Sequence, residues 1–291
     1  MRSLLFVPAD SGKKLAKALG CGADAVIVDL EDSIAPDRKA PARASAAAFV
    51  AEAASLSERP FICVRVNGLG SGLIDADLEA IVAARPDAIM LPKAEGGAAI
   101  VHADAKLAAQ EAINGLADGH IKIVAMAIES AAGFLLAGTF GRQSARLIGL
   151  SWGAEDLAAE LGAETNRDSA GRYTSPYRHA RTLCLMAAAT AQVPAIETIY
   201  MDYRDGEGLR RDTQEARRDG FTGRLAIHPL QVPIINEVFT PSAAALAAAQ
   251  AIVAAFAATP GAGVIAIEGV MYDRPHLARA QGLIARAKGT T

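Results

Sequence analysis

The chain has 291 residues, 52% of which are hydrophobic, and a formal net charge of −3 at pH 7. This length allows one large domain or two ordinary ones with a sizeable core, and the apolar content excludes global disorder. The slightly acidic balance leaves no basic footprint, so we expect no nucleic-acid partner. An anionic substrate would then be bound by a few placed cations and not by a bulk positive field.

Cysteine usage and the apolar runs indicate a cytoplasmic protein. Cys21, Cys63 and Cys184 are odd in number and form no C-x-x-C pair, which argues against a disulfide framework. We expect them to be small buried side chains in a reducing compartment. The N-terminal LLFVPA stretch is too short for a signal sequence, and no uninterrupted apolar run reaches membrane-spanning length. We therefore expect no membrane partner.

Short apolar runs alternate along the chain with longer alanine-rich stretches of helical period. We expect strands at Ser3–Val7, Ala25–Asp29, Phe61–Val66, Ala88–Leu91, Lys122–Ile128, Ala145–Gly149, Ala195–Tyr200 and Arg224–Ile227. We expect helices between them at Lys13–Leu19, Leu73–Ala84, Ala98–Asn114 and Tyr177–Ala191. Eight such units in about 230 residues predict an α/β fold of the TIM (β/α)8 barrel type. A doubly wound open sheet is the alternative.

The chain continues beyond the eighth expected strand. Pro241 begins an alanine-rich helix that runs through Ala258, Val264–Met271 has the pattern of extended chain, and Pro275–Lys288 that of a final helix. We therefore divide the chain into a barrel domain, residues 1–240, and a C-terminal extension, residues 241–291. The extension is too short for an independent domain, so it caps its own barrel or reaches a neighbouring subunit.

Charged side chains follow nearly every expected strand, at the end where TIM barrels carry their chemistry. They are Asp29, Glu31 and Asp32, then Arg65, Lys93, Glu129, Glu155 with Asp156, and finally His228. Glu129 and Asp156 end neighbouring strands, and two carboxylates without a Cys or His pattern suit Mg²⁺, with Mn²⁺ as the alternative ion. The other interpretation is that Glu129 caps the following helix and Asp156 sits in a first turn.

Arg65, Lys93 and His228 also lie at or just after the ends of expected strands, and the sequence around each allows more than one role. Arg65 can clamp a carboxylate or stabilise negative charge on oxygen, or it can form an ion pair with Asp29 or Glu31 inside the mouth. Lys93 can contact a phosphate or carboxylate, or pair with Glu95. His228 is a structural hydrogen-bonder or a base, and the sequence leaves both roles open.

The stretch GLSWGAEDLAAELG holds the only tryptophan of the chain, Trp152. We expect this residue to pack in a tight strand-to-helix turn, where the glycines admit a ligand or metal close to the backbone. Of the two acids in the stretch, we assign Asp156 to the metal because it pairs with Glu129. Glu155 is then a helix-start acid or a partner of the site residues.

Seven motifs stand in an order that resembles the citrate lyase β-subunit family, within the wider HpcH/HpaI aldolase group. They are RSLLFVPAD, VIVDLEDSIAP, VRVNG, MLPKAE, AIES, GLSWGAEDLAAELG and AIHPLQV, and the resemblance extends over about residues 2–285. It implies a TIM barrel that cleaves or forms a carbon–carbon bond beside a thioester carbonyl with Mg²⁺.

The resemblance also implies roles for individual residues. Glu129 and Asp156 match the metal ligands, and Arg65 matches the contact to the substrate carboxylate and enolate, with Asp29, Glu31 and Asp32 as the acids that orient it. Phe6 and Lys17 fall where related malyl-CoA lyases touch CoA. Ala9 replaces a glycine that is common in the family, so this turn and its CoA contacts can differ.

The segment GVMYDRPHLARA, Gly269–Ala280, resembles the C-terminal signature of stand-alone CoA-ester lyases. That resemblance implies that Asp273 is a catalytic base reaching a neighbouring subunit's site in a homo-oligomer, a trimer or a hexamer. The other interpretation is that Asp273 caps the helix at Pro275.

Together these residues predict a Mg²⁺-dependent lyase that cleaves a malyl-, citramalyl- or citryl-CoA-like 3-hydroxyacyl-CoA to an acyl-CoA and a 2-oxo acid. One alternative is a metal-dependent pyruvate aldolase that acts on CoA-free hydroxy-oxo acids. A second is a citrate lyase subunit in which an acyl-carrier protein replaces CoA. A third is a catalytically silent CoA-ester-binding protein, because a fold alone never establishes activity. The acyl group and the direction of the reaction are not readable from the sequence.

Overall fold

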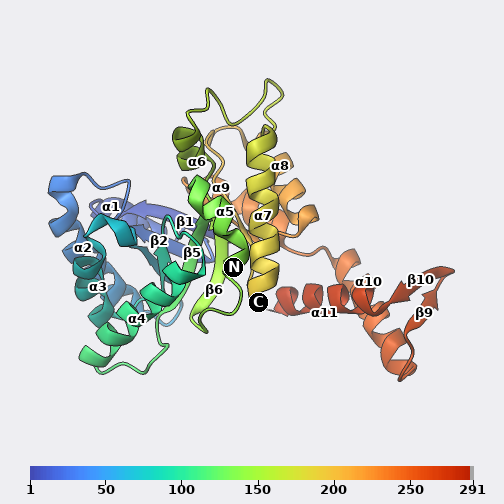
Figure 1. The fold of residues 1–291 in the computed structure, drawn as a ribbon. Coiled ribbons are helices and arrows are strands. Elements are labelled where there is room, and N and C mark those ends of the chain that lie inside the picture. The colour runs from blue at the N-terminus through green and yellow to red at the C-terminus, as the bar shows by residue number, and fades with distance from the viewer. Residues whose placement is uncertain (289–291) are drawn as a thin grey trace.

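A computed structural model describes residues 1–288 of the chain, and its centre is a sheet of eight parallel strands (Figure 1). The strands are β1 (Ser3–Pro8), β2 (Ala25–Asp29), β3 (Phe61–Arg65), β4 (Ala88–Leu91), β5 (Lys122–Ile128), β6 (Leu147–Trp152), β7 (Ile196–Glu197) and β8 (Gly223–Ala226). They pair in the order β6-β5-β4-β3-β2-β1-β8-β7, so the sheet curls into a nearly closed barrel. The predicted TIM barrel is confirmed.

Helices follow the strands and cover the outside of the barrel (Figure 1). They are α1 (Gly12–Ala18), α2 (Lys39–Ala54), α3 (Ile74–Ile81), α4 (Gly97–Ile113), α5 (Ala131–Leu136), α6 (Ala154–Leu161), α7 (Ser175–Ala191), α8 (Gly206–Asp219) and α9 (Gln231–Phe239). Short 3₁₀ turns lie at Pro36–Arg38, Leu69–Ser71, Val82–Ala84 and Ala137–Thr139.

The strands have apolar side chains on both faces because each face packs against protein. In β2, Ile27 points into a compact cluster inside the barrel, whereas its neighbours Val26 and Val28 belong to the larger cluster beneath the helices. This alternation is the two-residue period of a strand. The two cores hold the strand ends rigidly, and the loops at the carboxyl ends carry the polar residues of the site.

The barrel has a seam between β6 and β7. A single bridge, Leu150 with Ala195, joins the two strands there. We expected the sixth strand at Ala145–Gly149 and the seventh at Ala195–Tyr200, and both predictions were wrong in extent. β6 runs on through Gly149, whose missing side chain leaves room for Ile196 across the seam, since an added Cβ would lie 3.0 Å from that side chain. β7 pairs over two residues only.

The C-terminal extension comprises α10 (Ala243–Ala258), the antiparallel hairpin of β9 (Val264–Ile267) and β10 (Val270–Asp273), and α11 (Arg274–Lys288). In Figure 1 it projects from the barrel at the right, with the hairpin farthest out. Val264, Val270 and Met271 are exposed apolar side chains on this hairpin.

One segment of the described chain, Gln231–Ala258, could cross a membrane by length and composition, with 28 residues and a mean hydropathy of 1.6. Our expectation concerned an uninterrupted apolar run, and polar residues such as Asn236, Glu237 and Gln250 interrupt this segment. The segment is two helices, however, because Thr240 is extended between α9 and α10. Val232 and Ile235 on α9 are buried in the barrel core, where they serve packing.

Candidate active site

A cavity of about 730 Å³ opens at the carboxyl ends of the strands. Among the residues that the sequence singled out, its lining includes Phe6, Lys17, Asp29, Asp32, Arg65, Glu129, Asp156 and His228. These residues come from loops and strand ends far apart in the chain, so the barrel brings together the polar groups that were predicted to converge. Asp273 is not among the residues that line this cavity.

Arg65, the last residue of β3, is held on several sides. Its Nε donates to Asp29 Oδ1 at 2.7 Å and its Nη2 to Asp29 Oδ2 at 2.8 Å, while Nη1 lies 2.9 Å from Glu31 Oε2. The guanidinium also lies over the ring of Phe6, 4.8 Å from its centre. Burial opposes the charge, but these acids raise the pKa of Arg65 above its ordinary value. The expected ion pair with Asp29 and Glu31 is therefore present, and it fixes the arginine in the mouth.

Glu129 lies directly after β5 and is 5% exposed. Its Oε2 accepts the backbone N–H of Lys93 at 2.7 Å. Gly153, at the start of the next loop, leaves room for this carboxylate, because a Cβ there would lie 2.8 Å from Glu129 Oε1. Ser130 and not Glu129 caps α5, through the N–H of Gly133. The helix-cap interpretation of Glu129 was therefore wrong. Gly153 itself lines the cavity.

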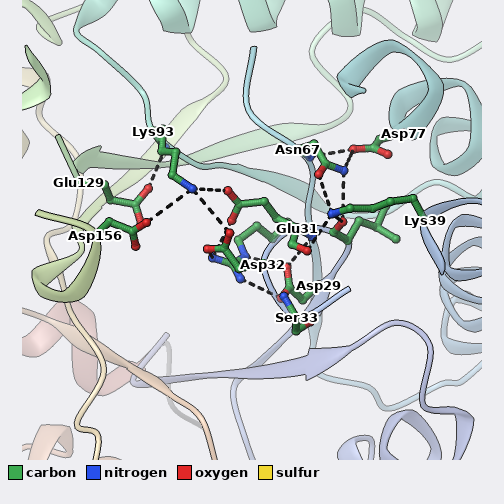
Figure 2. A network of polar contacts seen from close by, with 12 residues as sticks. Asp29, Glu31, Asp32, Ser33, Lys39, Asn67, Asp77, Lys93, Glu129 and Asp156 are labelled. Atoms are coloured by element: carbon green, nitrogen blue, oxygen red, sulfur yellow. Dashed lines mark hydrogen bonds and ion pairs between the residues drawn. The ribbon is translucent and has the colours of Figure 1, made fainter. Parts of the chain in front are cut away.

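The second carboxylate, Asp156, lies in the first turn of α6 and points toward Glu129 (Figure 2). Burial raises the pKa of Glu129 to about 8. The hydrogen bond from the Lys93 N–H opposes this rise, and the nearby negative charge of Asp156 adds to it. Glu155 is exposed at the edge of the same cavity, where its Oε1 accepts a hydrogen bond from Asn166 Nδ2 at 2.8 Å. The two acids of this turn therefore have different surroundings, and only Asp156 faces Glu129.

The donor set of this pair fits a hard divalent cation. Residues 1–288 contain no group of three or more His, Cys, Asp or Glu side chains arranged to hold a metal ion. Mg²⁺ is commonly bound by one or two carboxylates, with waters and substrate oxygens as its other ligands. Glu129 and Asp156 offer such a pair. Glu129 is buried and accepts one backbone N–H, and burial together with the Asp156 charge raises its pKa.

Lys93 and His228 were left open by the sequence. Lys93 Nζ lies 2.7 Å from Glu31 Oε1, and the expected pairing with Glu95 was wrong, because Glu95 instead accepts from Ser130 Oγ at 3.0 Å. His228 stacks on Tyr203 with ring centres 4.4 Å apart. Its Nδ1 accepts the N–H of Leu230 at 3.2 Å, so the imidazole is anchored to its own loop.

Trp152 ends β6 and packs as expected, fully buried. It also bridges the seam, because its Nε1 donates to Glu197 Oε1 on β7 at 2.6 Å. Arg181 Nε donates to the other oxygen of Glu197, also at 2.6 Å. The sequence did not lead us to predict this buried contact. A signal for it was Glu197, a charged residue inside the expected strand AIETIY. It also missed Lys14, which lines the cavity one helical turn before Lys17.

Asp273 lies at the end of β10, on the projecting hairpin. Its Oδ1 is 2.5 Å from His276 Nδ1 and accepts the backbone N–H of His276 at 3.4 Å. The residue therefore sits where a helix cap sits, directly before α11. Within a single chain it is not brought to the other site residues.

Comparison with known proteins matches residues 2–229 to the family model of the HpcH/HpaI aldolase/citrate lyase proteins. The chain belongs to this family. Within it, the chain is 36% identical to a (3S)-malyl-CoA thioesterase of Cereibacter sphaeroides, over 99% of this chain and 94% of the relative. It is 32% identical to the mitochondrial citramalyl-CoA lyase of Rattus norvegicus, over 98% of this chain and 86% of the relative.

Solved structures of the same family extend the likeness to the whole chain. The crystal structure of CitE from Mycobacterium tuberculosis in complex with magnesium, acetoacetate and coenzyme A superposes with a TM-score of 0.76 at 33% identity. The likeness covers 99% of this chain and 98% of that protein, so it includes the C-terminal extension.

Proposed function

We propose that the protein is a Mg²⁺-dependent carbon–carbon lyase that cleaves a 3-hydroxyacyl-CoA of the malyl or citramalyl type to an acyl-CoA and a 2-oxo acid. The observation that carries the proposal is one cavity that holds the two carboxylates Glu129 and Asp156 together with the fixed cation Arg65. The likeness to citramalyl-CoA lyase, and to CitE with magnesium and coenzyme A, supports the same chemistry.

In this proposal Glu129 and Asp156 hold the metal ion, which when bound supplies Lewis acidity to the substrate oxygens. Arg65 binds the negative oxygen that develops beside the thioester. Asp29 engages two of the five N–H donors of its guanidinium, while Nη1 forms an ion pair with Glu31. The other donors can face the substrate, and the ring of Phe6 keeps the guanidinium plane in place for them.

Cleavage removes the hydroxyl proton, breaks the adjacent carbon–carbon bond and leaves a thioester enolate, which takes up a proton on carbon. We assign the delivery of this proton to Asp273 of a neighbouring copy. In the condensation direction the same carboxylate removes a proton from the methyl group of the acyl thioester. The projecting hairpin and its exposed Val270 and Met271 support a homo-oligomer, a trimer or a hexamer. Lys14 and Lys17 on the cavity wall suit the phosphates of CoA.

A product assay tests the activity. Purified protein with malyl-CoA or citramalyl-CoA and Mg²⁺ is expected to release a 2-oxo acid, and EDTA is expected to abolish the release. Release of a 2-oxo acid from CoA-free hydroxy-oxo acids alone would favour the pyruvate aldolase. Mg²⁺ and CoA-ester binding without turnover would favour the silent binding protein.

Thioester hydrolysis is a second candidate, because the relative at 36% identity bears the name (3S)-malyl-CoA thioesterase. The two reactions differ in where the thiol goes. Carbon–carbon cleavage keeps the thioester in acetyl-CoA, whereas hydrolysis frees the CoA thiol. A thiol reagent such as DTNB, added during turnover of malyl-CoA, separates them: no new thiol is expected for the lyase, and stoichiometric thiol for hydrolysis.

Subunit mixing tests the role of Asp273. Asp273→Asn and Glu129→Gln are each expected to be inactive as pure proteins. When the two chains are co-expressed, some sites combine an intact mouth with an intact Asp273, and activity is expected to return. Full activity of pure Asp273→Asn, or no recovery in mixed oligomers of normal size, would remove Asp273 from the reaction.

A further inference from the structure

Lys93 follows β4 and lies between the acids of the mouth, although the lyase chemistry above gives it no role (Figure 2). Its ammonium is 2.7 Å from Glu31 Oε1, 3.5 Å from Asp156 Oδ1 and 3.6 Å from Asp32 Oδ1. One cation is therefore shared by three carboxylates, and one of the three is Asp156, which we assign to the metal.

The backbone of Lys93 is engaged as well. Its φ of 49° lies in the left-handed region, which non-glycine residues rarely adopt. In this conformation its N–H donates to Glu129 Oε2 at 2.7 Å. Such strain persists where the surrounding structure over-determines it, as at functional sites. The residue thus contacts Glu129 through its main chain and Asp156 through its side chain.

The ammonium of Lys93 remains charged and in place. The ammonium donates to Glu31 Oε1 at 2.7 Å, and Asp32 lies 3.6 Å away on the same side. Glu31 is itself buried and lies 2.9 Å from Arg65 Nη1. If Lys93 moved away, this buried carboxylate would lose its hydrogen-bonding partner, which is costly. The positive charge is therefore a fixed part of the mouth.

We propose that Lys93 sets the affinity of the metal site. Its ammonium is a tethered cation that competes with the divalent ion for the negative charge of Asp156. This inference rests on the proposed function, since it presupposes that Glu129 and Asp156 hold the metal. Its consequence is that the metal binds weakly to the free protein and more tightly together with an anionic substrate. Binding of metal and substrate is then thermodynamically coupled.

Lys93→Met tests the proposal, because methionine is unbranched, keeps the backbone N–H and removes the charge together with the hydrogen bond to Glu31. Calorimetric titration with Mg²⁺ is expected to give a dissociation constant about tenfold lower than that of the wild type. Lys93→Arg retains the charge and is expected to bind like the wild type. Lys106→Met is the matched control, since Lys106 also pairs with an acid, Asp75, but outside the mouth.

Oxalate provides a second readout that a merely structural lysine would not affect. This dianion offers two oxygens to Mg²⁺ and adds negative charge that offsets Lys93. The difference in Mg²⁺ affinity between wild type and Lys93→Met is therefore expected to shrink in saturating oxalate. The fluorescence of Trp152 monitors the fold of each variant beside the site.

Unchanged or weaker Mg²⁺ binding by a folded Lys93→Met protein would overturn the inference and leave the proposed function intact. The proposed metal site itself is tested in the same series by Glu129→Gln. If that variant bound Mg²⁺ as the wild type does, the metal assignment and the inference built on it would both be wrong.

Discussion

Asp29 and Glu129 are two carboxylates of the same mouth with nearly equal burial, 2% and 5% exposed, yet their pKa values shift in opposite directions. Arg65 donates two hydrogen bonds to Asp29. These contacts lower the pKa of Asp29, although burial acts to raise it. Burial raises the pKa of Glu129 to about 8, because the carboxylate accepts one N–H, from Lys93, and the negative charge of Asp156 lies nearby. Burial alone therefore does not decide the charge of an acid. The acid without a neutralising partner is the one that an added cation would complete.

The strongest test of this difference removes the charge of Glu129. Glu129→Gln is expected to reduce Mg²⁺-dependent cleavage by about a thousandfold or more, because a metal ligand and its Lewis acidity are lost together. Asp156→Asn is expected to have a similar effect. Glu155→Gln, one residue away on the rim, is the matched control and should stay within about threefold of wild type. Equal losses in Glu155→Gln and Asp156→Asn would contradict the assignment.

Asp29 is the carboxylate that Arg65 neutralises. Asp29→Asn is expected to lower kcat/KM about a hundredfold while Mg²⁺ binding is retained, because Arg65 loses the partner that orients it. Steady-state kinetics at saturating Mg²⁺ measure this. Asp24→Asn is the control, since Asp24 forms a similar two-donor pair with Arg2 at the other end of the barrel. A loss of Mg²⁺ affinity in Asp29→Asn would show that the two acids are not distinct.

Gly153→Ala tests how the position of the Glu129 carboxylate affects metal binding. The added Cβ would lie 2.8 Å from the Glu129 carboxylate, so this side chain has to shift. We expect about tenfold weaker Mg²⁺ binding and a small loss of stability, measured by calorimetry and thermal unfolding. Gly138→Ala, where no atom lies within 4 Å of the new Cβ, should change neither. Wild-type Mg²⁺ binding by Gly153→Ala would mean that the close contact does not position Glu129.

The smallest expected effect is on the pH dependence of stability without metal. The folded pKa of Glu129, about 8, exceeds its ordinary value of 4.5. Its proton therefore stabilises the folded protein fully below about pH 4.5, and this contribution is lost as the pH rises through 8. In EDTA, urea unfolding followed by Trp152 fluorescence should show about 2 kcal/mol less stability at pH 8.5 than at pH 6.5. Glu129→Gln should flatten this slope, and an unchanged slope would contradict the assigned pKa.

Much of the barrel could be predicted from the sequence because its strands are buried on both faces. The bounds of β2, β4 and β5 agree with prediction, since each is an apolar run between polar or turn residues. The convergence of Glu129 and Asp156 followed from strand order alone, because the carboxyl ends of neighbouring parallel strands meet at one end of the barrel.

Other features depend on contacts between distant side chains, which no local pattern encodes. The left-handed backbone of Lys93 and the fit of Gly153 against Glu129 arise only once the strands are packed. The seam contact of Trp152 with Glu197 is of the same kind, and it compensates for the short pairing of β7. The location of Asp273 in an oligomer depends on a second copy, so its role remains a proposal.

The most direct test of the account is a Mn²⁺ titration of the wild type, Glu129→Gln and Asp29→Asn, with bound ion counted by electron paramagnetic resonance. We expect one ion per chain in the wild type and in Asp29→Asn, and no bound ion in folded Glu129→Gln at the same concentrations. Wild-type binding by Glu129→Gln, or loss of binding in Asp29→Asn alone, would contradict the claim that the acid without a neutralising partner holds the metal.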